Sequence, residues 1–263
     1  MTTTSGTIAV GTAGWALRTD VQGEFEGDGT HLARYARRFG GVEINSSFYR
    51  PHRRTTYERW AASVPPAFRF AVKVPRTITH ELRLRSAETQ IERFLDEVAG
   101  LGDRLGPLLV QLPPSLAFDE GAAQGFLHAL RTRHGGQVVL EARHPTWFGE
   151  RAEALLRLHD VAGVAADPAP VPAAAEPRGS RSLVYVRLHG SPVIYRSRYD
   201  TARVHGVATT LAEAAADGAD AWCIFDNTAD GFATVNALEL MDALRRVSAA
   251  RPATAAGGRS PSS

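Results

Sequence analysis

The sequence contains very little cysteine and no long hydrophobic run. Cys223 is the only cysteine of 263 residues, so no internal disulfide can form, which is typical of proteins in a reducing cytoplasm. It lies in an apolar run, which favours a buried thiol over a nucleophile. No apolar stretch approaches the ~20 residues of a membrane-spanning helix, and residues 1–6 lack the pattern of a signal peptide. We therefore expect a cytoplasmic protein without a membrane partner.

An excess of charge of one sign is also absent. The 30 basic and 28 acidic residues give a formal net charge of +2, so the overall charge does not itself predict nucleic-acid binding, although a local basic site would be compatible with it. Hydrophobic residues make up 44% and charged residues 22% of the chain, as in ordinary globular proteins. The length is close to the ~250 residues of one (β/α)8 domain.

Short apolar segments that end in polar residues are the main structural signal. Seven of them end at Asn45, Lys73, Gln111, Arg143, Asp167, His189 and Asn227, and an eighth runs into the glycine-rich turn at residues 11–15. Apolar stripes with helical spacing follow most of them, for example over residues 30–39, 148–159 and 204–216. This alternation predicts an α/β fold, a TIM-like (β/α)8 parallel barrel formed by one domain over residues 1–248.

One repeat is irregular. Four prolines fall between Pro168 and Pro177, and proline breaks a continuous helix. We expect the sixth helix of the barrel to be missing or replaced by a Pro-rich loop. Residues 249–263 are rich in Pro, Ala, Gly and Ser without apolar periodicity, which predicts a disordered tail.

The candidate site lies where the strands end. Side chains two residues apart share a strand face, so Glu43 faces the same side as Asn45, and Arg187 the same side as His189. In a parallel barrel, the carboxyl ends of the strands converge on one mouth. We predict Glu43, Lys73, Glu141 and His189 as catalytic residues. The predicted substrate-binding residues are Trp15, Asn45, Tyr49, His80, Gln111, Arg143, His144, Arg187, Asp226 and Asn227.

Each of these assignments has a structural alternative. Glu43 can belong to a buried network with Arg143 or Lys73, and His144 can cap the next helix. Residues 11–15 can form a plain turn. Alternatively, the Trp15 ring forms one wall of the ligand site. Lys73 can act as a base or Schiff-base nucleophile, but an ion pair with Glu43 or Glu141, or contact with an anion, is favoured.

No cofactor is predicted. The chain has no His-x-x-x-His motif and no cysteine pair, and the cations expected in the mouth disfavour a divalent ion. A divalent metal held by Glu43, Glu141, His144, His189 and Asp226 is the minor alternative.

Several motifs together resemble the YecE-like family of unknown function. They are GTAGW at residues 11–15, VEINSSFY at 42–49, FAVK at 70–73, ITH at 78–80, VQLPP at 110–114, EARH at 141–144, YVRLHG at 185–190 and FDN at 225–227. The resemblance implies a TIM-barrel-like fold and no established activity, and analogy with metal-dependent barrel enzymes that cut DNA suggests nucleic acid as a partner. The sequence departs from the family pattern in two places. Residues 16–20 lack the Trp- and Tyr-containing stretch that is usual after the first Trp, and Asp226 stands where Asn is common.

Two functions remain open at this point. The first is an enzyme, a hydrolase or a lyase or isomerase without a redox cofactor, that uses acid–base chemistry on a phosphorylated or other anionic small molecule. The second is a non-catalytic protein that binds nucleic acid or nucleotides through the same cations and the Arg- and Tyr-containing loop that follows His189.

Overall fold

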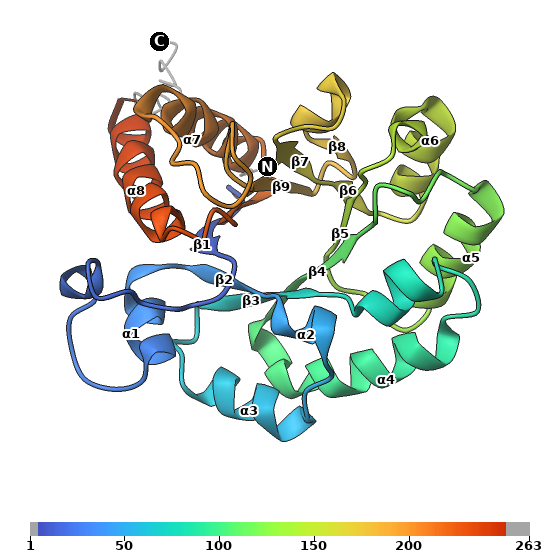
Figure 1. Cartoon of the computed structure of the whole chain (residues 1–263), viewed down its shortest axis with the longest axis horizontal. Coiled ribbons are helices and arrows are strands. Elements are labelled where there is room, and N and C mark those ends of the chain that lie inside the picture. The colour runs from blue at the N-terminus through green and yellow to red at the C-terminus, as the bar shows by residue number, and fades with distance from the viewer. Residues whose placement is uncertain (1–4, 251–263) are drawn as a thin grey trace, which may run out of the picture.

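Strands and helices alternate along the chain in the computed structural model, which describes residues 5–250. The helices lie around the outside of the strands (Figure 1). The strands are β1 (Ile8–Thr12), β2 (Gly41–Ile44), β3 (Arg69–Lys73), β4 (Leu105–Gln111), β5 (Val138–Glu141), β6 (Ala162–Gly163), β7 (Ala165–Asp167), β8 (Arg178–Gly179), β9 (Leu183–Leu188) and β10 (Asp220–Phe225).

The helices follow the apolar stripes of the sequence. The α-helices are α1 (His31–Arg38), α2 (Ser46–Tyr49), α3 (Arg54–Ala62), α4 (Glu88–Val98), α5 (Glu120–Arg131), α6 (Glu150–Leu158), α7 (Thr201–Ala216) and α8 (Phe232–Ala250). Short 3-10 helices occupy η1 (Gln22–Glu24), η3 (Ala99–Arg104), η4 (Pro145–Phe148) and η5 (Pro172–Ala175), and η2 (Thr77–Glu81) is a short π-helix. The side chains of Thr30, Asp119 and Asp200 cap α1, α5 and α7, as short polar residues do at helix starts.

Within residues 5–250, the hydrogen bonds do not close the strands into one barrel. They form two sheets, with strand orders β1-β10-β9-β7 and β2-β3-β4-β5-β6-β8. One break is at Val164, because β6 before it pairs with β5 while β7 after it pairs with β9. At the other boundary, β1 and β2 are joined by a single bridge between Ala13 and Glu43. The predicted α/β fold with mainly parallel strands is confirmed, whereas the complete barrel is not.

The connection between β7 and β9 contains no α-helix in the described chain. It forms only the short turn η5 and β8, which pairs antiparallel with β6. This agrees with the Pro-rich sequence of residues 168–177, because proline lacks the N–H that a helix needs. At the other end, α8 extends to Ala250, and the rest of the tail predicted to be disordered lies outside the described residues.

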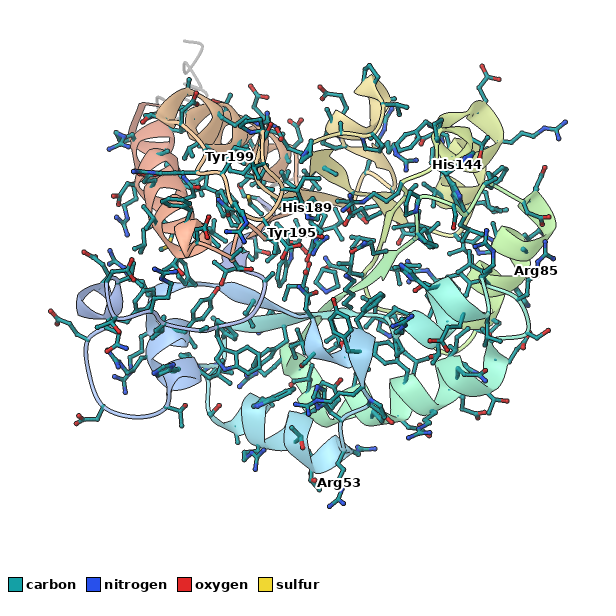
Figure 2. All side chains as sticks on the ribbon, viewed as in Figure 1. Arg53, Arg85, His144, His189, Tyr195 and Tyr199 are labelled. Atoms are coloured by element: carbon teal, nitrogen blue, oxygen red, sulfur yellow. The ribbon has the colours of Figure 1, made fainter. Side chains whose placement is uncertain are left out.

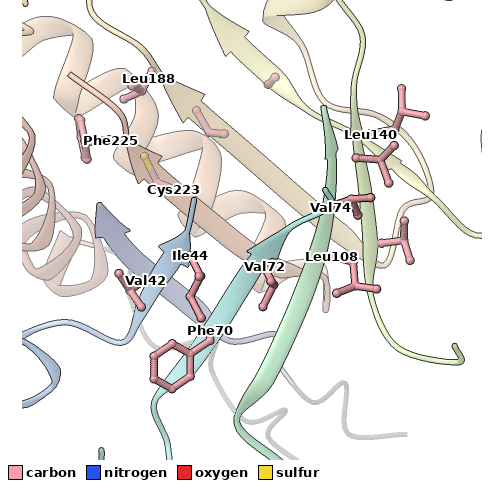
Figure 3. Packing of buried hydrophobic residues seen from close by; sticks show 14 of the residues in the cluster. Val42, Ile44, Phe70, Val72, Val74, Leu108, Leu140, Leu188, Cys223 and Phe225 are labelled. Atoms are coloured by element: carbon pink, nitrogen blue, oxygen red, sulfur yellow. The ribbon is translucent and has the colours of Figure 1, made fainter. Parts of the chain in front are cut away.

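Side chains from the two faces of the strands pack into two separate apolar clusters. Val42, Ile44, Phe70 and Val72 belong to the larger cluster, which includes the buried faces of the helices (Figure 3). The smaller, inner cluster lies on the opposite strand face and contains Ala9, Ala71, Leu109, Val139, Ala162, Val164, Ala166, Leu183, Tyr185, Trp222 and Ile224. The strand parity predicted from the sequence is therefore confirmed.

A large ring fills the inner space near the amino ends of the strands. A Cβ atom at Gly41 would lie 2.7 Å from the Trp222 ring, and one at Gly106 would lie 3.0 Å from it. A side chain at Gly41 would therefore displace the Trp222 ring, and one at Gly106 would press against it. The polar residues of the inner face are left at the opposite end, which we call the mouth.

Candidate functional site

A buried ion cluster centred on Arg187 occupies the mouth. Arg187 Nη2 lies 2.6 Å from Glu43 Oε1, and Nη1 lies 2.6 Å from Glu141 Oε2. Nε donates to Glu43 Oε2 at 3.0 Å, and Nη2 also reaches Asp226 Oδ2 at 3.1 Å. The cluster thus joins β9 to β2, to β5 and to the residue that follows β10. A guanidinium can satisfy several carboxylates at once because its donors form a planar fork.

Burial makes these ion pairs depend on one another. The side chains of Arg187 and Glu43 are 0% exposed, and that of Glu141 is 1% exposed. Burial alone would raise the pKa of Glu141, but the charges of Arg187 and His189 hold it well below its ordinary value. Burial likewise disfavours the charged form of Arg187, and the Glu43 and Glu141 carboxylates overcome this and raise its pKa. The Glu141 carboxylate therefore remains ionised.

His189 lies between two carboxylates. Its Nδ1 is 3.0 Å from Asp226 Oδ2, and its Nε2 is 3.0 Å from Glu141 Oε1. Arg143 Nη2 lies 2.9 Å from the same Nε2 and 2.5 Å from Glu141 Oε1. Burial lowers the pKa of His189, but the Glu141 charge and the hydrogen bonds with Asp226 and Glu141 raise it above the ordinary value. The ring therefore has a carboxylate to donate to when Nε2 is protonated, and a guanidinium donor when it is not.

Lys73 does not form the predicted ion pair with Glu43 or Glu141. Among the described residues its ammonium has no hydrogen bond or ion pair, and it lies over the Phe48 ring, 4.2 Å from the centroid. The reason is competition, because the two glutamates are bound by Arg187. Burial first, and then the charge of Arg187, lower the pKa of Lys73 to about 8.

Two tyrosines that are not among the predicted catalytic and substrate-binding residues also belong to the site. Tyr185 is fully buried, and its hydroxyl donates to Glu43 Oε2 at 2.9 Å. Strand parity could have identified it, because Tyr185 is two residues before Arg187. Tyr195 comes from the loop after β9, and its ring packs edge-on to His189 with centroids 6.1 Å apart. Figure 2 shows His189 and Tyr195 together near the centre of the molecule.

Three of the predicted binding residues lie at the edge of the cluster. Gln111 Oε1 accepts a hydrogen bond from Arg187 Nη1 at 3.4 Å. His80 packs edge-on against Phe48 at 4.9 Å, and partial burial and the Lys73 charge lower its pKa. Asn45 directly follows β2, and its Oδ1 is buried without a hydrogen-bond partner among the described residues.

Four predicted binding residues have other contacts. Trp15 packs on Trp60 at 5.1 Å, on the outer side of the strands. The turn before it is structural, because the N–H of Gly14 donates to Glu43 O at 2.9 Å. Tyr49 is 71% exposed. His144 caps the turn η4 by accepting from Thr146 N, and lies away from His189 toward α6 (Figure 2).

The fourth is Asn227. Its Nδ2 donates to Ser197 O at 2.9 Å and to Asn236 Oδ1 at 3.0 Å. It therefore ties the loop after β9 to α8 and supports the position of Tyr195. Binding of a ligand by Trp15, Tyr49, His144 or Asn227 stays a prediction that none of these contacts supports.

The metal alternative finds no ready ligand set in the described part of the chain. In residues 5–250, no three His, Cys, Asp or Glu side chains are grouped in a way that could hold one. The carboxylates of the mouth instead form ion pairs with Arg187.

No helix in the same part of the chain is long and apolar enough to span a membrane.

The sequence matches the family described as "Protein of unknown function DUF72" over residues 9–257. The chain belongs to the DUF72 family. The UPF0759 protein YecE of Escherichia coli (strain K12) is 36% identical over 151 residues, which are 55% of this chain and 55% of that protein. The same identity and coverage are found for YecE of Escherichia coli O157:H7. The alignment with these curated relatives thus spans about half of their length.

Two solved structures of DUF72 proteins resemble the fold. The protein from Enterococcus faecalis V583 has a TM-score of 0.77 and 21% identity, and the comparison covers 90% of this chain and 95% of that one. The protein from Thermotoga maritima MSB8 has a TM-score of 0.74 and 22% identity, with coverages of 91% and 99%. At these identities the likeness shows the fold alone, so the chemistry of this DUF72 chain has to be argued from its own residues.

The stability of this DUF72 protein should depend on pH in a way set by the mouth. The folded-state pKa values of Glu141 and Asp226 are lowered, so their contribution is present above the unfolded values of 4.5 and 3.8 and is lost as the pH falls through the folded values. The folded-state pKa of His189 is raised above 6.5, so its contribution is lost as the pH rises through that folded value. The contribution of these three groups to the free energy of unfolding in urea should therefore be largest between about pH 4.5 and 6.5.

A His189→Asn variant is the control for this profile. This variant should still lose stability as the pH falls. As the pH rises, it should not show the loss of stability that comes from deprotonation of the His189 imidazole. An unchanged alkaline side would mean that His189 has the same pKa in the folded and unfolded states.

Proposed function

We propose that the two sheets are the halves of a TIM-like (β/α)8 barrel, and that this protein is an enzyme acting at its mouth. The reaction is acid–base chemistry on a small anionic substrate without a redox cofactor, as in a hydrolase or a lyase or isomerase. One observation carries the proposal: His189 has a hydrogen-bond partner in both protonation states. A group that can gain or lose a proton without leaving a buried polar atom unpaired is suited to general acid–base catalysis.

Arg143 is the proposed binding group for the anion. Its side chain is 18% exposed, whereas that of Arg187 is fully buried. Its Nε is buried and has no hydrogen-bond partner among the described residues, so one donor of this guanidinium is unsatisfied. Since Nη2 of the same guanidinium lies 2.9 Å from His189 Nε2, an anion held by Arg143 would lie near the proton-transferring atom.

The remaining charges have supporting roles in this proposal. Arg187 uses its donors on Glu43, Glu141 and Asp226, so it positions these carboxylates. Glu43 also accepts a hydrogen bond from the Tyr185 hydroxyl, and its side chain is fully buried, as is that of Arg187. The three carboxylates balance Arg187, Arg143 and Lys73, and a protonated His189 leaves the mouth positive. An added anion would neutralise that charge.

Binding of inorganic phosphate tests the anion site. Phosphate at ~100 times its Kd should stabilise the wild-type protein by about 2.7 kcal/mol, visible as a rise in Tm. The rise should shrink with added salt, because other ions compete for the same site. Arg143→Gln should abolish it. Arg151→Gln is the matched control, because Arg151 is 84% exposed and pairs with Glu120 outside the mouth. A rise that survives Arg143→Gln would contradict the assignment.

A panel of phosphorylated and carboxylated small molecules, followed by NMR for product formation, tests whether the protein is an enzyme. The alternative is a non-catalytic nucleic-acid or nucleotide binder, which would use Arg196 and Arg198. These side chains pair with Asp230 and Glu239. A single-stranded oligonucleotide that raises Tm more than phosphate, with no compound of the panel converted, would favour the binder.

A further inference from the structure

Lys73 is unusual in the chain as a whole. Lysine and arginine together number 30, and Lys73 is the only lysine among them. Everywhere else this protein uses arginine where it needs a positive charge. The two differ chemically, because a guanidinium stays protonated, whereas an amine can lose its proton and become a nucleophile. The one amine side chain of the protein lies at the mouth, as the last residue of β3.

The surroundings of Lys73 fit a nucleophile better than a structural cation. It is 8% exposed, and the carboxylates close enough to influence it belong to the ion pairs of Arg187. Contact with the Phe48 ring replaces a carboxylate partner. A buried amine beside a positive charge is the arrangement that makes lysine reactive at neutral pH, and the pKa of Lys73 is accordingly lowered to about 8.

We propose that Lys73 Nζ forms a Schiff base with an aldehyde or ketone that carries a carboxylate or phosphate group, the charged group being held by Arg143. This names the substrate class of the proposed enzyme and rests on that function. No other residue of the sequence offers a side-chain amine for this reaction.

The reaction needs no oxidant or reductant. The neutral amine attacks the carbonyl carbon while the carbonyl oxygen takes a proton from the His189 imidazolium, giving a carbinolamine. The attacking nitrogen returns one proton to His189, which gives it to the hydroxyl oxygen as the C–O bond breaks and water leaves. The iminium nitrogen then gives its remaining proton to His189. One amine and one carbonyl become one imine and one water, and His189 ends in its starting state.

Reductive trapping tests the proposal directly. The full-length protein is incubated with glyoxylate, pyruvate or glyceraldehyde 3-phosphate and with cyanoborohydride, which reduces the imine to a stable secondary amine. Mass spectrometry should find the adduct at Lys73, saturating with carbonyl concentration, and formed faster than at the N-terminal amine, which is an internal reference. Neutral glycolaldehyde should label Lys73 less than glyoxylate does, because it lacks the anion.

Two variants control for accessibility. Lys73→Arg should lose the side-chain label. Combining it with Arg151→Lys places the only lysine at an 84% exposed position, where labelling should be slow and unsaturable. Labelling of the wild type should be half-maximal near pH 8, whereas the introduced exposed lysine should need a pH near ~10.4. Lys73→Met should raise Tm at neutral pH, because it removes a buried charge without an ion-pair partner.

The outcomes separate this inference from the proposed function. Suppose that phosphate raises Tm through Arg143, but that none of the carbonyl compounds labels Lys73 faster than it labels the exposed lysine at position 151. The Schiff base is then wrong, and the anion-binding enzyme stands. If neither phosphate binding nor labelling is seen, both proposals fail. Saturable labelling at Lys73 that phosphate suppresses supports both.

Discussion

Replacement of Arg187 by methionine is expected to destabilise the protein by about 3–5 kcal/mol, the cost of breaking a buried ion pair by removing one partner. Methionine roughly preserves the volume but leaves Glu43 and Glu141 buried without their cation. Since whole domains are stable by only ~5–15 kcal/mol, the variant should unfold at a much lower urea concentration or fail to accumulate. Chemical unfolding followed by circular dichroism measures the effect.

The control variants test whether the destabilisation comes from the carboxylates left unpaired rather than from loss of an arginine side chain. Arg151→Met removes an 84% exposed arginine and should leave the unfolding midpoint unchanged, because exposed ion pairs contribute little. Adding Glu43→Gln and Glu141→Gln to Arg187→Met should restore part of the lost stability, since it removes the unpaired charges. If Arg187→Met is as stable as the wild type, the carboxylates must be protonated or solvated, and the charge balance of the mouth is different from the one described.

The positions of the site residues were largely predictable from the sequence, because strand parity depends only on the alternation of side chains. Glu43, Lys73, Glu141 and Arg187 all lie on the inner face as predicted. Tyr185 has the same parity and could have been included. Parity does not apply to turns, so it gives no position for Trp15: the N–H of Gly14 in its turn donates to Glu43 O, and the Trp15 ring packs on Trp60.

The pairing of charges could not be predicted from the sequence. Arg187, Arg143 and Lys73 are all cations beside the same carboxylates, and which of them binds Glu43 depends on side-chain reach and on the planar fork of arginine. The same limit applies to barrel closure. The segment that ends at Asp167 was expected to be one of the eight barrel strands, but Val164 separates β6 from β7, which pair in different sheets. Such an interruption leaves no signal in an apolar run.

Substitution of His189 should have the largest effect on catalysis. His189→Asn keeps a donor toward Asp226 but cannot carry the proton, so kcat/KM for the compound that the wild type converts should fall roughly 10²–10⁴-fold. Comparison of Tm values shows whether the fold survives. A loss of activity equal to the loss of folded protein would indicate a structural role only.

Asp226→Asn tests the role of His189 as the general acid through the pH dependence of kcat/KM rather than through loss of activity. Asn can still hydrogen-bond to Nδ1 of His189, which lies 3.0 Å from Asp226 Oδ2, but it removes a negative charge that helps to keep the imidazole protonated. The pKa of His189 should therefore fall. If protonated His189 is the general acid, kcat/KM declines as the pH rises through this pKa, and the alkaline limb of the profile should move to lower pH in Asp226→Asn. Arg151→Gln should leave the limb in place. An alkaline limb that does not move in Asp226→Asn would assign the titrating group to a residue other than His189.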